Sequence, residues 1–300
     1  MINLSKYSRP ENLALHCLLS SQMKACRSWP KFDEIAASYG AESTIPDGLD
    51  PSIRLISPEV LRDQAQDPGC IGEGVGFTFS RPGAIVSGRG IWCGARIIDN
   101  DLGDADQGTS LDSAFCAVSK MGLPPYHADE HDPTSENHVI DTHNLPLADQ
   151  LIAFDARTRF EVYRIDNSDA SDTFEQIWSA LAMPESRIVI TSGLKPSFFN
   201  LANGGIATGL QMGGNDDRHC QVICGADYQT REVFYCNSWG KWAGLWIPVK
   251  RAPRPPMWQC EISQVNVASG LFWTLPGAYR GDLSTLQALS EIRVVRRLAA

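Results

Sequence analysis

The chain has 300 residues, of which 43% are apolar and 20% are charged, and its net charge is −9. This is the composition of a globular protein that is large enough for one sizeable core or two smaller ones, and it argues against disorder. The acidic balance and the scattered Lys and Arg argue against a nucleic-acid partner, since neutralising phosphates takes clustered basic side chains.

The N-terminal part, residues 1–58, is expected to be an extension that leads into the main domain. It carries amphipathic helical patterns over 11–28 and 31–39, followed by a Pro- and Gly-punctuated stretch at 45–51. Its first ten residues are polar and lack the apolar segment of a secretion signal. No stretch approaches the ~18 apolar residues that span a bilayer, so we expect a soluble protein without a membrane span.

The central part, residues 59–250, changes its hydrophobic period midway. Up to about residue 126 the pattern is helical, including a helix over 110–121 that ends at Gly122. Beyond residue 146, alternating runs predict strands at 160–165, 187–191, 220–224 and 232–236, with one helix at 172–181 among them. This order predicts an α+β domain with a helical and a strand-rich subdomain and a cleft between them.

The last part, residues 251–300, is expected to be a C-terminal extension that packs on this domain. It offers a possible strand at 270–275 and a helix or strand at 285–298.

No metal or other cofactor is expected. The nine cysteines have no paired CxxC spacing, so most are interpreted as buried thiols rather than zinc ligands or disulfides. His127, His131, His138 and His143 lie among acidic residues in a polar segment, which is more typical of an exposed loop than of a metal site.

One predicted hairpin brings a histidine and an asparagine together. Its turn at 227–230 centres the pairing near residue 228 or 229, so His219 and Asn237 should lie opposite one another. A general-base imidazole needs one nitrogen held by a fixed partner, and an Asn carbonyl oxygen can hold it. Asn237 opens the run Asn-Ser-Trp-Gly, and we expect the indole of Trp239 to shield the His–Asn hydrogen bond from water.

The matching nucleophile is Cys70. It follows a Pro-Gly turn at the start of an apolar, small-residue stretch, where a helix N-terminus would stabilise a thiolate. Gln64 lies six residues earlier and could donate its amide to an oxyanion at the same place.

These motifs resemble the papain-like (C1) cysteine peptidases. The resemblance rests on Gln64 through Cys70-Ile-Gly, on the strand that begins at His219, and on Asn237-Ser-Trp-Gly, with His219 149 positions after Cys70. It is closest to the bacterial and phage branch, in which Cys-Val-Gly occurs at the nucleophile. The resemblance implies a papain-like two-subdomain fold with a β-barrel-like strand subdomain. It also implies a Cys-His-Asn triad that cleaves amide bonds of a peptide or protein through a thioester, in the cytoplasm or in a virion.

The chain departs from this family at the nucleophile helix and beside the histidine. Glycines at 72, 74 and 76 should weaken the helix by up to about 1 kcal/mol each relative to Ala. Glu73 would raise the pKa of the Cys70 thiol if its carboxylate faced inward. Cys220 stands where Ala is usual.

Alternatives remain open at this stage. Gln107 lies six residues before Ser113, so Ser113 is a rival nucleophile, with Cys116 as a further candidate. The chain could also be a papain-like structural or interaction protein, for instance a phage tail or head component that contacts other virion proteins. A third possibility keeps the triad and cleaves cell-wall (peptidoglycan) peptides.

Overall fold

The computed structural model describes residues 29–33, 50–56, 60–64, 68–81, 83–99, 108–127, 130, 160–166, 169–201, 206–207, 218–240, 244–249, 261–263, 271–281, 283 and 290–298. No helix within these ranges is long and apolar enough to cross a bilayer. The helical pattern predicted at 11–28, nearly all of that at 31–39, and His131, His138 and His143 lie outside the described residues.

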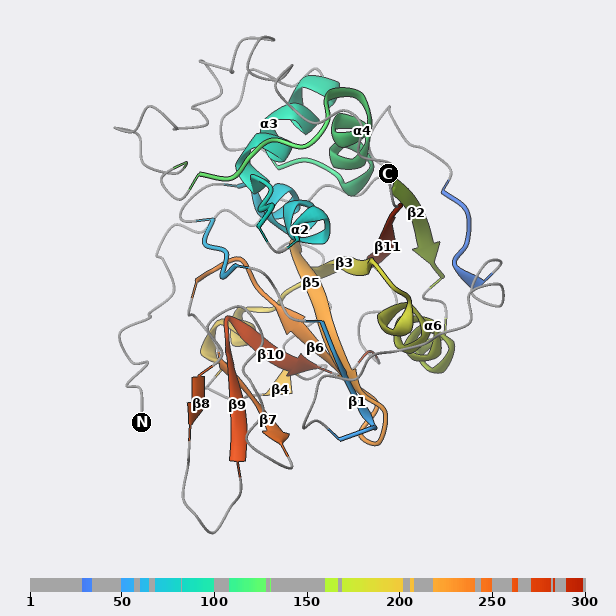
Figure 1. The fold of residues 1–300 in the computed structure, drawn as a ribbon, viewed down its shortest axis with the longest axis vertical. Helices are drawn as coiled ribbons and strands as arrows, with labels where there is room; N and C mark the ends of the chain where they lie inside the picture. Colours follow the sequence, from blue (N-terminus) through green and yellow to red (C-terminus); the bar gives the residue numbers. More distant parts are fainter. Residues whose placement is uncertain are drawn as a thin grey trace.

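Three helices form one half of the molecule (Figure 1): α2 (Cys70–Phe79), α3 (Gly88–Asp99) and α4 (Leu111–Met121). The helix predicted at 110–121 is thereby confirmed as α4. Its N-cap is Ser110, whose hydroxyl accepts the backbone N–H of Ser113, and its C-cap is Gly122 with a φ of 91°.

An open eight-stranded sheet forms the other half. Its spatial order is β2-β11-β3-β5-β6-β10-β4, with β1 attached to β5, and all pairs are antiparallel except β10 with β4. The strands are β1 (Ile53–Leu55), β2 (Phe160–Ile165), β3 (Ser186–Gly193), β4 (Ile206–Ala207), β5 (Arg218–Asp227), β6 (Glu232–Cys236), β10 (Ala278–Gly281) and β11 (Glu291–Arg297). The two ends of this order do not pair within the described strands, so the expected barrel-like closure is absent there.

The four central strands predicted from alternation are confirmed as β2, β3, β5 and β6. The boundary predicted at residue 250 stays a prediction, but two strands beyond it are internal to the sheet. β10 lies between β6 and β4, and β11 lies between β2 and β3. These strands therefore belong to the sheet itself rather than packing on it from outside.

Side chains that alternate along the strands build a core on each face of the sheet. Ile188 and Ile190 of β3 face the cluster that includes α6 (Ala170–Ala182), whereas Val189 between them joins the cluster around α2 and α4. The sheet is thus covered by helices on both faces. A separate three-stranded sheet has the order β7 (Gly244–Val249), β9 (Leu271–Pro276), β8 (Glu261–Ser263).

Candidate active site

Cys70 is the first residue of α2. Its N-cap is Gly69, which makes no side-chain capping bond, so the helix begins with backbone N–H groups around the sulfur position. This is the place where the helix dipole favours a negative charge. Cys70 is a thiol and not half of a disulfide.

Two glycines in α2 allow the helix to pack very closely against its neighbours. A Cβ atom on Gly72 would lie 2.0 Å from the carbonyl oxygen of Gly88 at the start of α3. A Cβ on Gly74 would lie 2.6 Å from the sulfur of Cys220 on β5. The glycines that weaken the helix intrinsically are therefore what lets α3 and β5 pack against it, and Cys220 fits the space that Gly74 leaves.

The imidazole of His219 is hydrogen-bonded to the side chain of Asn237, with 2.7 Å between Nε2 and Oδ1. The same Oδ1 accepts the backbone N–H of Ser238 at 2.7 Å. Because a backbone N–H can only donate, the amide atom must be oxygen, and Nε2 must then carry the hydrogen. In the neutral ring the lone pair is left on Nδ1, which is buried and has no hydrogen-bond partner among the described residues. Nδ1 is therefore the atom that can take a proton.

The predicted hairpin register was wrong by two residues. Val222 pairs with Cys236 and Ile223 with Tyr235, so the pairing extrapolates to Gln221 opposite Asn237 and centres near residue 229. A bulge between Ile223 and Gly225 changes the register again toward the turn. Asn237 lies just past the end of β6 and reaches His219 diagonally. The pair is brought together, although not as direct cross-strand neighbours.

The ring of Trp239 lies over that of His219. The ring centroids are 4.4 Å apart with an interplanar angle of 29°, and Phe198 packs edge-on against the indole at 6.2 Å. Trp239 is itself buried. An apolar plane against the imidazole keeps water from the Nε2–Oδ1 bond and fixes the ring orientation.

Gln64 is hydrogen-bonded to the segment that carries Asn237. Its backbone N–H donates to the carbonyl of Ser238 at 2.7 Å, and the hydroxyl of Ser238 donates to its Oε1 at 2.5 Å. Gly240 adds a further hydrogen bond between the same two segments, because its N–H donates to the carbonyl of Arg62 at 2.9 Å. Its φ of +56° favours glycine. Since Ser238 engages the amide oxygen, the NH₂ end of Gln64 is the end that points elsewhere, and this is the donor an oxyanion requires.

The negative charge of Glu73, near the sulfur of Cys70, is compensated by a buried arginine. Its carboxylate accepts a hydrogen bond from Nη1 of Arg62 at 2.9 Å, and both side chains are almost completely buried, with 2% and 4% exposed. The other guanidinium nitrogen donates to the hydroxyl of Ser80 and the carbonyl of Val86, each at 2.8 Å. The expected rise in the thiol pKa from Glu73 is therefore opposed by a cation two residues before Gln64.

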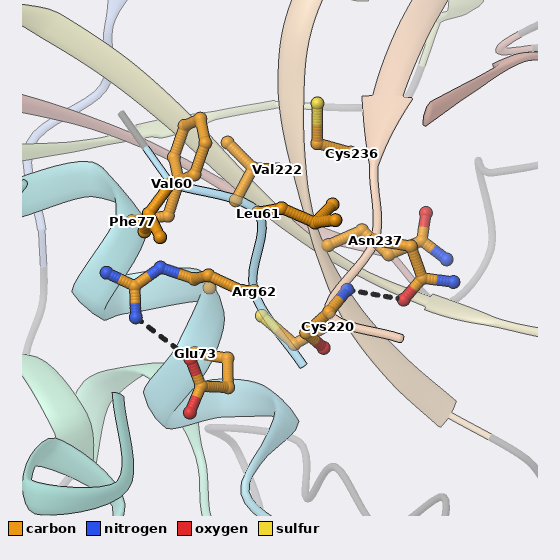
Figure 2. Close-up of a pocket in the computed structure, with 12 residues that line it drawn as sticks. Val60, Leu61, Arg62, Glu73, Phe77, Cys220, Val222, Cys236 and Asn237 are labelled. Atoms are coloured by element: carbon orange, nitrogen blue, oxygen red, sulfur yellow. Dashed lines mark hydrogen bonds and ion pairs between the residues drawn. The ribbon is translucent and has the colours of Figure 1, made fainter. Parts of the chain in front are cut away.

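A small pocket lies between α2 and the strands beside this ion pair (Figure 2). Glu73, Gly74 and Phe77 line it from α2, and Cys220 lines it from β5. Its cavity volume of about 20 Å³ is room for one water, far below what a peptide needs. Burial, followed by the nearby Cys70 thiol, raises the pKa of the Cys220 thiol well above its usual value.

Ser113 and Cys116 lie elsewhere, on α4. The hydroxyl of Ser113 bonds to the carboxylate of Asp99 at the end of α3 and lies 2.9 Å from the hydroxyl of Ser110. Figure 1 shows α4 on the far side of α2 from β5, and α2 is the helix that packs against β5. Asn237 and Trp239 thus contact His219, and Gln64 is bonded to Ser238 beside Asn237. Ser113 instead takes part in the N-terminal capping of α4.

The candidate site residues are closed off in this conformation. Cys70, Gln64 and His219 each have 0% of their surface exposed. Another molecule can reach the sulfur of Cys70 only after part of the surrounding structure has moved.

No family model matches the chain, and no curated protein matches it in sequence. Solved structures do match. Xylellain, a cysteine protease from Xylella fastidiosa, is 14% identical with a TM-score of 0.51, and the match covers 91% of this chain and 99% of that one. The proform of Amb a 11, a cysteine protease and ragweed pollen allergen, is 13% identical with a TM-score of 0.53, covering 96% of this chain and 75% of that one.

The chain has a papain-like fold. At this level of identity the likeness extends to the fold alone, which confirms the predicted α+β class with its helical and strand-rich halves. It leaves the expected place in a bacterial and phage branch as a prediction.

Sequence reasoning missed two residues of the site. Ser238 could have been found, because it lies inside the Asn-Ser-Trp-Gly run and only its partner Gln64 was unknown. Arg62 gives no such signal, since nothing in the spacing from Arg62 to Glu73 indicates that the two side chains meet.

Proposed function

We propose that the protein is a papain-like cysteine peptidase that cleaves peptide or protein amide bonds through Cys70, His219 and Asn237. The observation that carries this proposal is the Nε2–Oδ1 bond of 2.7 Å beneath the Trp239 indole. It leaves Nδ1 as the only ring atom of His219 that can exchange a proton.

In the proposed reaction the thiolate of Cys70 attacks the carbonyl carbon, and the C–N bond breaks as imidazolium His219 gives its Nδ1 proton to the leaving amine. Water then adds to the thioester, with Nδ1 taking its proton, and collapse of the intermediate releases the acid and restores the Cys70 thiolate beside imidazolium His219. The NH₂ group of Gln64 and the backbone N–H of Cys70 stabilise both oxyanions. Asn237 holds the ring without itself changing protonation.

The complete burial of Cys70 and His219 supports a second candidate. In that reading the chain is a papain-like structural or interaction protein whose site stays closed. The two candidates differ in turnover, because only the first predicts new peptide N-termini.

The test combines an electrophilic epoxide probe with an unfolded protein substrate. For a peptidase we expect label on Cys70 and new N-termini from the substrate, both lost in Cys70→Ala and retained in Ser113→Ala, the matched control on the neighbouring helix. A wild-type protein that gives neither label nor cleavage would support the closed scaffold. Loss of both signals in Ser113→Ala with retention in Cys70→Ala would assign the nucleophile to α4.

A further inference from the structure

The Arg62–Glu73 ion pair lies where the three parts of the candidate site meet. Through its side chain Arg62 binds the nucleophile helix at Glu73, three residues after Cys70. Through its backbone carbonyl it binds Gly240, which closes the segment that carries Asn237 and Trp239. Two residues further along the same extended segment is Gln64. One residue thus links nucleophile, oxyanion donor and imidazole support.

The pair is built into the interior. Nη1 of Arg62 lies 2.9 Å from the Glu73 carboxylate, and Nη2 bridges Ser80, which caps the end of α2, and Val86, which precedes α3. The carboxylate itself fills the space that a Cβ on Gly88 would enter at 2.3 Å. Such a buried pair often contributes little net stability compared with apolar side chains, so its presence calls for another role.

Electrostatics give that role a direction. Glu73 is one helical turn from Cys70, so its negative charge disfavours a thiolate, and the positive charge of Arg62 beside it cancels that effect. Other charged groups act on titratable side chains near these elements: Asp63 and Glu130, together with the pair, act on the pKa of Tyr126, and Arg218 and Glu291, together with Cys70, act on that of Cys220, which follows His219 on β5. At Tyr126, Glu73 raises the pKa and Arg62 lowers it.

We propose that the Arg62–Glu73 pair is a positioning device of the site, which aligns Gln64 with the nucleophile helix and keeps the thiolate of Cys70 free of the Glu73 charge. This inference rests on the proposed function for what the thiolate does, but its electrostatic part concerns the thiol alone. Arg62 and Glu73 touch no reacting atom, so neither is a catalytic residue.

The test measures the pH midpoint of Cys70 ionisation from the ultraviolet absorbance of the thiolate, as the difference between each variant and the same variant with Cys70→Ala. Arg62→Met should raise the midpoint, by on the order of one pH unit, because it leaves the carboxylate uncompensated. Glu73→Gln, which is isosteric, should lower it because it leaves the guanidinium. The double variant should return it to the wild-type value.

Two further variants complete the design. Arg62→Lys keeps the charge and loses the planar fork, so we expect a wild-type midpoint with a lower kcat and an unchanged KM. Arg81→Met removes the surface pair of Arg81 with Glu185, which are 2.6 Å apart, and should leave the midpoint unchanged.

Opposite shifts from the two single variants cannot arise from a purely structural role, which would lower stability in both and move the midpoint in neither. Equal midpoints in wild type, Arg62→Met and Glu73→Gln overturn the inference. If Arg62→Met does not fold, an unshifted Glu73→Gln overturns it alone. An inactive wild-type protein with opposite midpoint shifts would reject the peptidase and keep the electrostatic role of the pair.

Discussion

The two halves of the site are held by different kinds of interaction. On the strand side, His219 is fixed by the backbone ladder to β3, in which it pairs with Ser192, and by the Trp239 ring. On the helical side, the helix that carries Cys70 packs closely against its neighbours because Gly72 and Gly74 have no side chains, and one buried ion pair holds it in place. The backbone hydrogen bonds of a ladder repeat at a fixed period along the strand, whereas a close contact between two elements depends on the residue at that one position. We therefore expect most single substitutions along the strands to be tolerated. Single substitutions at the close contacts of α2 should destabilise the fold.

The largest effect expected from this contrast is on stability, at Gly72. Gly72→Ala places a methyl group 2.0 Å from a backbone oxygen of α3, which should lower the free energy of unfolding by about 3 kcal/mol or more. Gly94→Ala is the matched control within α3, because its methyl group meets only the Ala117 and Met121 side chains at 3.2 and 3.3 Å. Chemical denaturation measures both. Equal stabilities of the two variants would contradict the close-packing account.

On the strand side the largest effect is expected from Asn237. Asn237→Ala leaves the Nε2 hydrogen of His219 buried without its acceptor, at a cost of about 2 kcal/mol, or roughly 30-fold in kcat/KM. Tyr279→Phe is the control, since it removes a buried hydroxyl that donates to Gln221 on the same strand as His219. It should lower stability and leave the rate unchanged. Similar rates for wild type and Asn237→Ala would show that the ladder alone orients the imidazole.

Cys220 joins the two halves, and its burial predicts a pH dependence of stability. Burial raises the pKa of this thiol in the folded state, so the folded protein holds the proton more tightly than the unfolded chain. The resulting stability is complete below the usual pKa of 9.0 and is lost as the pH rises above it, because the unfolded thiol ionises first.

The measurement compares wild type with Cys220→Ala. We expect the decline in the free energy of unfolding above pH 9 to be less steep in the variant, by up to about 1.4 kcal/mol per pH unit. Parallel declines in the two proteins would mean that Cys220 ionises equally in both states.

The smallest effect is expected at Ser238, which joins the halves through Gln64. Ser238→Ala removes the hydroxyl that holds the Gln64 oxygen, and we expect a loss of about 1 kcal/mol, or roughly five-fold in kcat, with KM unchanged. Alkylation of Cys70 forms no oxyanion and should proceed at the wild-type rate. A parallel loss in both reactions would assign Ser238 to the nucleophile instead.

The same contrast explains what the sequence could predict. Period-two alternation predicted β2 and β6 with the boundaries that the structure shows, and the turn at 227–230 brought His219 near Asn237. The register was off by two because the turn lies between Asp227 and Glu232, later in the chain than the predicted turn at 227–230, and the bulge between Ile223 and Gly225 shifts the pairing back by only one residue. The Gly72–Gly88 contact and the Arg62–Glu73 pair could not be predicted, because each depends on how α2 packs against segments that follow no periodic rule.

The central claim is that His219, held by Asn237, makes Cys70 a nucleophile. It is tested most directly by the pH dependence of Cys70 alkylation by iodoacetamide, read by mass spectrometry of the Cys70 peptide in wild type and His219→Ala. We predict a wild-type rate that stays nearly constant from about pH 5 to pH 8, because imidazolium pairs with thiolate. In His219→Ala the rate should fall about ten-fold per pH unit below about pH 8.5. Identical profiles with an ordinary thiol pKa in both proteins would contradict it.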